Sequence, residues 1–258
     1  MNTSDWAAFP YQSKAYFYPD EALTESWDTL HRGDAEPLPV SNDILEAWRR
    51  YHAGNFAGAA SLAKEIGPDA HAVANKASGI YADYLEENEN TRLAIYKAGI
   101  KRAESAISTH PDDANAHYFH AFLLGRYSQS ISIARALSQG IGGKVRESLE
   151  NALELAPGHA EAHTALGLYH AEIIGKIGRM VGRLTYGASI EEALDHFEQA
   201  LSLTPDAPIA HLEYGNGLYL MFGDKRLEES NAAYKKAASI KPVDAMQRLD
   251  MEFAKASI

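Results

Sequence analysis

The chain lacks cysteine altogether and is poor in valine, and each shortage excludes a class of structure. Without Cys, thiol catalysis, thiolate metal sites and disulfides are all excluded. Valine occurs 5 times and alanine 43 times among 258 residues, which favours helix over sheet because β-branched residues populate strands. The longest apolar runs are only a few residues long. We therefore expect an all-α protein with no membrane-spanning segment.

Acidic residues outnumber basic ones, which limits the partners that the whole surface can bind. The chain has 35 Asp and Glu against 24 Lys and Arg, a net charge of −11. A surface of that sign repels phosphate, so we expect no nucleic-acid partner. A secretory signal begins with a basic region followed by an apolar one, and the first residues of this chain contain neither. We expect a cytoplasmic protein, or a periplasmic one if a signal peptide has been removed.

Repeated segments indicate stacked helical hairpins. Similar segments start at residues 114, 160 and 208, and others end at prolines 157, 205 and 242, with looser copies ending at 111 and 68. Between residues 190 and 201 the apolar positions follow the i, i+3, i+4, i+7 pattern of a buried helical stripe. Ser189 and Glu192 predict a capping box at its start. An alanine stands five residues before each of the closing prolines 111, 157, 205 and 242, where a small side chain permits close helix packing.

The repeats resemble those of the tetratricopeptide repeat (TPR) superfamily over roughly residues 42–242. The residues that carry the likeness are Leu166, Gly167, Ala193, Phe197, Ala200 and Pro205, and then Tyr214, Gly215, Tyr234, Ala237 and Pro242. The spacing between closing prolines exceeds the usual 34 residues, and His replaces the first-helix tryptophan. Such long repeats are similar to those of TRAP-transporter T-component and regulator-of-microtubule-dynamics proteins. The likeness implies a right-handed α-solenoid of about five helix pairs.

The extra length falls between the two helices of the central repeats, near residues 126–143 and 172–187. No acid occurs from 114 to 146 or from 173 to 190. The same stretches hold seven basic residues, namely Arg126, Arg135, Lys144, Arg146, Lys176, Arg179 and Arg183. We expect two lengthened hairpins that protrude side by side and form one basic edge. This edge could bind a protein or peptide partner, and such a partner would be acidic.

The second hairpin carries a glycine-rich stretch. If residues 173–184 form one helix, Gly175, Gly178 and Gly182 share one face and the three basic residues share the adjoining face. The glycines then mark close approach of a helix or a partner. Alternatively, the glycine face packs under the neighbouring hairpin and the basic residues are only solvated. The sequence of residues 140–144 does not match the motif of a phosphate-binding loop, and it predicts a tight turn between helices.

Histidine recurs at one repeat position, but no catalytic or metal-binding motif accompanies it. His117, His163, His211 and, less regularly, His71 lie too far apart along a stack of helices to share one ion. We expect them to pack or hydrogen-bond between helices. No nucleophile motif or metal-binding helix motif occurs. We expect no enzyme activity, no cofactor and no metal.

Both ends of the chain predict segments that cover the terminal repeats. Residues 1–40 are rich in aromatic side chains and predict a capping segment, with a helix that Asp20 caps and Gly33 ends. Alternatively, this segment lies in the concave groove as a built-in ligand. Residues 41–242 predict the repeats, and 243–258 a C-terminal capping helix with Met246, Leu249 and Phe253 facing inward.

These features favour a non-catalytic interaction module, either a scaffold or an adaptor. Helix-pair solenoids offer a concave groove, and the basic edge offers a second surface. The resemblance to T-component proteins implies an alternative, a small-ligand-binding accessory protein of a transport system. The oligomeric state and the identity of the partner do not follow from the sequence.

Overall fold

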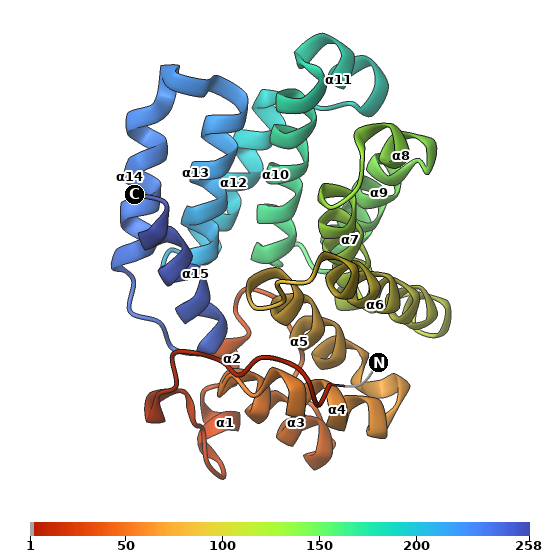
Figure 1. Cartoon of the computed structure of the whole chain (residues 1–258), viewed down its shortest axis with the longest axis vertical. Helices are drawn as coiled ribbons and strands as arrows, with labels where there is room; N and C mark the ends of the chain where they lie inside the picture. Colours follow the sequence, from red (N-terminus) through yellow and green to blue (C-terminus); the bar gives the residue numbers. More distant parts are fainter. Residues whose placement is uncertain (1–2) are drawn as a thin grey trace. The chain divides into compact units, whose positions relative to one another are not determined.

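The computed structural model describes residues 3–258, and this range contains helices and turns but no strand (Figure 1). The all-α expectation is confirmed. Two very short helices come first, α1 (Ala22–Glu25) and α2 (Trp27–Leu30). Five hairpins follow, namely α3 (Asn42–His52) with α4 (Phe56–Ile66), α5 (His71–Tyr84) with α6 (Glu89–Thr109), α7 (Ala114–Gln129) with α9 (Ile141–Leu155), α10 (Ala160–Ile177) with α12 (Ile190–Leu203), and α13 (Pro208–Phe222) with α14 (Leu227–Ser239). Short helices α8 (Ile133–Ser138) and α11 (Arg179–Tyr186) interrupt the two long hairpins, and α15 (Ala245–Ala256) comes last. Single 3-10 turns are η1 (Lys14–Tyr16), η2 (Pro68–Ala70) and η3 (Gly223–Arg226).

The chain folds as two compact units, and each is described by itself. Unit 1 consists of residues 1–31, 36–155 and 243–246. Unit 2 consists of residues 32–35, 156–242 and 247–258. Helix α8 therefore belongs to unit 1 and α11 to unit 2. The single edge expected from the two long hairpins stays a prediction, as do the segment boundaries expected at residues 40 and 242.

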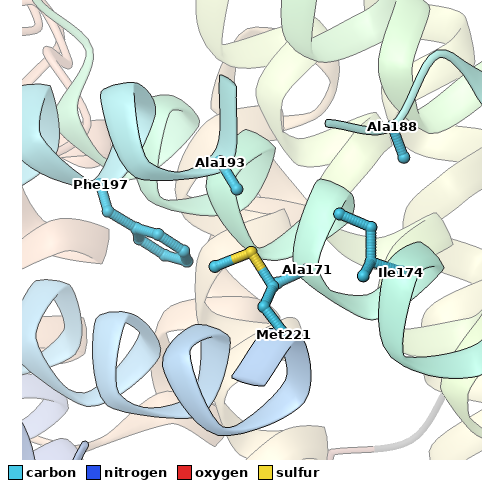
Figure 2. Close-up of a cluster of buried hydrophobic side chains, with 6 residues drawn as sticks. All are labelled: Ala171, Ile174, Ala188, Ala193, Phe197 and Met221. Atoms are coloured by element: carbon cyan, nitrogen blue, oxygen red, sulfur yellow. The ribbon is translucent and has the colours of Figure 1, made fainter. Parts of the chain in front are cut away.

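Phe197 forms the centre of the unit 2 core. Its side chain is fully buried on α12, and it packs with Ala171 of α10, Ala193 and Met221. Figure 2 shows the Phe197 ring and the Met221 side chain directed toward each other. Gly217 of α13 leaves room for the ring, because a Cβ there would lie 2.5 Å from Phe197 Cε2. Residues with small side chains thus let α10, α12 and α13 pack around one aromatic ring.

The repeat alanines behave as expected, since Ala106, Ala152, Ala200 and Ala237 are all buried. The capping box at the start of α12 is only half formed. Ser189 Oγ accepts a hydrogen bond from the Glu192 N–H at 3.1 Å. The Glu192 carboxylate instead lies 3.1 Å from Nε2 of His170, which is buried on α10. The reciprocal contact is therefore replaced by a link between helices.

Three repeat histidines make the same hydrogen bond. Nε2 of His117, His163 and His211 lies 2.8, 3.1 and 2.9 Å from the carbonyl oxygen of the proline that closed the preceding helix. These side chains do form hydrogen bonds, but the shared partner is the preceding turn and not, as had been expected, a neighbouring helix. His163 also contacts a neighbouring helix, with its Nδ1 2.9 Å from His196 Nδ1. His71 departs from the set, because its Nε2 lies 2.8 Å from Asp113 Oδ2.

The aromatic N-terminal segment packs on the first helices of unit 1. The Trp6 ring stacks on Tyr81 of α5, with centroids 4.1 Å apart. Phe9 meets Phe56 of α4, and Trp27 meets the fully buried Trp48 of α3. The single helix expected after Asp20 is wrong. Asp20 has a φ of 48°, and α1 and α2 form separately after it.

Helix α15 has a different inner face from the one expected. Leu249 and Ala254 are buried, and Ala254 packs with Leu212 and Ala237 in unit 2. Phe253 is 50% exposed, so its placement on the inner face is wrong. The buried side of this helix is lined instead by smaller or more flexible side chains, including Met251.

Candidate functional site

The glycine-rich stretch does not form one helix, which corrects the expected arrangement of its faces. Helix α10 ends at Ile177, Gly178 adopts a φ of 80°, and α11 starts at Arg179. A positive φ is accessible to glycine without steric cost, so Gly178 allows the chain to leave one helix and enter the next. The three-faced helix expected over residues 173–184 is therefore wrong.

Each of the three glycines has its own structural role. A Cβ on Gly175 would lie 3.2 Å from the carbonyl oxygen of Leu220, so this glycine permits close approach of α13. Gly182 is buried on α11, where a Cβ would meet Ile173 at 3.0 Å. Gly178 forms the break. Close helix approach, one of the two roles considered for these glycines, therefore applies to Gly175.

Helix α11 lies beyond the end of α10 (Figure 1) and is held there by several contacts. The Ala188 N–H donates to the Gly182 carbonyl at 3.2 Å, and the Tyr169 hydroxyl donates to the Tyr186 carbonyl at 3.4 Å. Arg179 lies over the Phe222 ring, 5.9 Å from its centroid. These contacts fix the short helix on the α10–α12 hairpin of unit 2.

The outer face of α11 is apolar and exposed. Met180 is 75%, Val181 49% and Leu184 83% accessible. At 100° per residue the three side chains fall within about 100° of one another. Monomeric proteins rarely leave such neighbouring apolar side chains in water unless the surface binds something. We call Met180, Val181 and Leu184, with Arg179 and Arg183, the α11 face.

The two arginines lie together along one side of the apolar side chains. Arg179 and Arg183 are exposed, lie one helical turn apart, and form no ion pair within residues 3–258. Their charges act on Glu191 at the start of α12. Hydrogen bonds from its own N–H and from Ser189 hold the pKa of Glu191 below its usual range, and Arg183 and Arg179 lower it further. The α11 face is therefore both apolar and positively charged.

Three of the other basic residues are engaged with acids. Arg126 Nη2 lies 3.1 Å from Asp83 Oδ2, Arg146 Nε lies 2.7 Å from Glu150 Oε1, and Lys176 Nζ lies 2.8 Å from Glu172 Oε2. Asp83 lies far from Arg126 in the sequence, so no local pattern reveals that pair. The acids that pair with Arg146 and Lys176 lie one helical turn away, just outside the acid-free stretches, and only Asp83 comes from a distant segment.

Unit 1 has a smaller surface of the same kind on α8. Ile133 and Leu137 are 50% and 48% exposed, with Arg135 exposed between them. Lys144 is exposed in the first turn of α9, and neither cation forms an ion pair in the described part of the chain. Gly140, with a φ of 63°, forms a turn before α9, but the rest of the turn expected over residues 140–144 is wrong, because α9 already begins at Ile141.

The described residues contain no group of three His, Asp or Glu side chains placed to hold a metal ion. In the same range, no helix has the length and apolar character needed to cross a membrane.

A family model described as Regulator of microtubule dynamics protein 1-3 matches residues 47–255. The chain belongs to this family. Regulator of microtubule dynamics protein 3 of Xenopus laevis is 28% identical over 127 residues, which cover 47% of this chain and 27% of the frog protein. The Bos taurus protein of that name is 26% identical over 133 residues, 48% of this chain and 28% of its own length. The matches thus span less than a third of these regulator of microtubule dynamics proteins.

The fold of this family member also has a solved relative. The crystal structure of a thermophilic TPR protein of Thermus thermophilus superposes with a TM-score of 0.57 at 18% identity. The alignment covers 83% of this chain and 98% of that protein. The likeness confirms the TPR fold that the repeats predict. TPR folds and this family are generally non-catalytic, and the fold is suited to protein interaction.

Proposed function

We propose that this chain is a non-catalytic scaffold that binds a partner polypeptide through the α11 face. The observation that carries the proposal is the exposure of Met180, Val181 and Leu184 on a helix that the fold holds in place. A preformed apolar surface binds without first losing conformational freedom, which favours affinity. Unit 2 provides this rigid support.

The charge of the surface indicates the kind of partner. Arg179 and Arg183 lack ion-pair partners within residues 3–258, so a carboxylate can approach both. An amphipathic helix with apolar residues at i and i+3 or i+4, and acids beside them, complements this face. Burying each large apolar side chain contributes about 1.5–3 kcal/mol. The two ionic contacts add specificity and speed association.

Capture of partners from native lysate tests the proposal. One variant combines Arg179→Glu with Arg183→Glu, and a second combines Met180→Ser with Leu184→Ser. The matched control is Lys235→Glu with Lys236→Glu, which makes the same charge change on exposed residues of α14 in the same unit. All three should keep the wild-type circular dichroism, because exposed substitutions change stability by about 0.5 kcal/mol or less.

Loss of the same captured polypeptide in both α11 variants, but not in the control, supports the proposal. Its binding should also weaken as salt is raised, because exposed charges are screened. Retention by both α11 variants contradicts the proposal and directs attention to the concave groove. Sedimentation with vesicles containing phosphatidylserine is a further arm. Lipid binding that depends on Leu184, with no captured polypeptide, would also contradict it.

The alternative of a small-ligand accessory protein makes a different prediction. In that case the α11 variants behave like wild type, and no polypeptide is captured by any of the proteins.

A further inference from the structure

A pocket in unit 1, unrelated to the α11 face, has the features of an anion site. It has a volume of about 250 Å³ and opens between α4, α5 and α6. Its polar lining residues are Lys64, His71, Arg102 and Ser105, and the methyl groups of Ala74 and Ala106 form part of the wall. Two of these four polar residues are permanently charged cations, and none of the four is an acid. The lining is therefore positive although the protein as a whole is acidic.

Arg102 is the central observation, because its charge is largely buried without a counter-charge. Its Nε donates to Asn75 Oδ1 at 2.8 Å, and its Nη2 lies 3.5 Å from Ser78 Oγ. Both partners are neutral, and no carboxylate within residues 3–258 forms an ion pair with the guanidinium. Burial lowers the pKa of Arg102. A desolvated cation with neutral partners is energetically unfavourable, and an incoming anion offsets that penalty.

Two neighbouring polar groups are also unsatisfied. Nδ1 of His71 and Nδ2 of Asn75 are buried without a hydrogen-bond partner in the described structure. His71 is 94% buried and lines the pocket. The first turn of α5 lines it too, and that helix has no side-chain N-cap, although Asp113 contacts His71 in this turn. Buried polar groups are nearly always paired in folded proteins. The two unpaired nitrogens are packed beside Arg102 and are not exposed to the pocket, so it is the guanidinium without a counter-charge, on the pocket wall, that indicates a ligand.

The charges around the pocket restrict the ligand to a small anion. Asp113 contacts His71 from α7 at 2.8 Å. Burial alone would raise the pKa of Asp113, but hydrogen bonds from His71 and from the Ala116 N–H hold it below its usual range. An ionised carboxylate beside His71 disfavours phosphate, which concentrates two charges on one group, more than a ligand that places a single charge at Arg102. The planar fork of Arg102 matches a carboxylate, which accepts two parallel hydrogen bonds.

We propose that the Arg102 pocket binds a carboxylate carried on a short aliphatic chain. The guanidinium of Arg102 holds the carboxylate, the Lys64 ammonium at the exposed rim adds a second charge, and the alanine methyl groups contact the aliphatic part. Two sources have this chemistry, the glutamate side chain of a bound polypeptide and a free short-chain dicarboxylate. This proposal does not rest on the α11 face and concerns the other unit.

Titration with two probes tests the site and separates the sources. Glutarate represents the free dicarboxylate, and the blocked peptide acetyl-Ala-Glu-Ala-amide represents the side chain. Binding is followed on the ¹⁵Nε resonance of Arg102 in the full chain. We expect saturable binding of at least one probe, with a Kd on the order of 1 mM or tighter. Binding of glutarate alone assigns a metabolite, and binding of the peptide assigns a polypeptide.

Matched variants decide whether Arg102 is responsible, with calorimetry as the readout. Arg102→Gln should weaken binding at least tenfold, whereas Lys101→Gln, an exposed neighbour on the same helix, should leave it unchanged. Lys64→Gln, on an exposed side chain, should weaken it several-fold and serves if Arg102→Gln does not fold. Equal binding by wild type and Lys64→Gln overturns the proposal. So does the absence of binding by both probes, or binding of inorganic phosphate in preference to them.

Discussion

Replacing Gly217 by alanine should destabilise unit 2, although alanine normally stabilises the interior of a helix. The added Cβ would lie 2.5 Å from Cε2 and 2.6 Å from Cζ of Phe197. The ring has little room to move away, because Gly167 on the other side leaves only 3.0 Å for a Cβ of its own. Overpacking costs about 1–3 kcal/mol, and the gain in helix propensity is about 1 kcal/mol. We expect a net loss of up to about 2 kcal/mol.

In a protein that already carries Phe197→Ala, the Gly217→Ala substitution should stabilise unit 2 instead of destabilising it. Phe197→Ala should cost about 3–5 kcal/mol, because it leaves a cavity in place of a fully buried ring. In that background Gly217→Ala meets no ring and should stabilise by about 1 kcal/mol. The two effects of the same substitution differ by the overpacking cost, about 1–3 kcal/mol, which exceeds the roughly 0.5 kcal/mol seen for independent sites.

Urea unfolding of the four proteins, followed by far-UV circular dichroism, measures the cycle. Tryptophan fluorescence is unsuitable here, because Trp6, Trp27 and Trp48 all belong to unit 1. If Gly217→Ala has the same effect with and without the Phe197 ring, the packing described for α10, α12 and α13 is refuted.

Three further predictions concern hydrogen-bonded groups. Burial lowers the pKa of His52 below its usual 6.5, despite the hydrogen bond to Asp244. As the pH falls, His52 is therefore protonated in the unfolded chain before it is protonated in the folded protein. Unit 1 should lose stability as the pH falls through about 6.5. Fluorescence-monitored unfolding at about pH 7.5 and 5.5 checks this, and His52→Gln should reduce the difference. His163→Ala removes the hydrogen bond to the Pro157 carbonyl and should cost about 1 kcal/mol in a thermal melt. Ser189→Ala removes the α12 cap at a similar cost, and Ser189→Asp should restore most of the loss.

The repeat architecture could be predicted because its determinants are local in sequence. A proline that closes one helix and a histidine six residues later, as in Pro157 and His163, form one hydrogen-bonded turn. The sequence therefore contains both partners within one short segment. Phe197 and the small residues around it follow the same logic, since a repeated spacing places them on one buried stripe.

The site could be predicted only in part, because its details depend on contacts between distant segments. Spacing alone made residues 173–184 look like one helix, whereas the turn at Gly178 breaks it. The apolar character of Met180 and Leu184 was visible in the sequence, but their exposure was not. Arg102 shows no local motif, because its neutral partners come from the preceding helix.

The most direct test of the central claim places a photo-crosslinking amino acid at Leu184 and, in a second protein, at Lys235. Both positions are exposed in unit 2, and only the first lies on the α11 face. The account predicts that native lysate yields a defined polypeptide adduct at position 184 that is absent at 235 and is lost with Arg179→Glu and Arg183→Glu. The same adducts at both positions, or none at 184 while the protein still captures a partner, would contradict it.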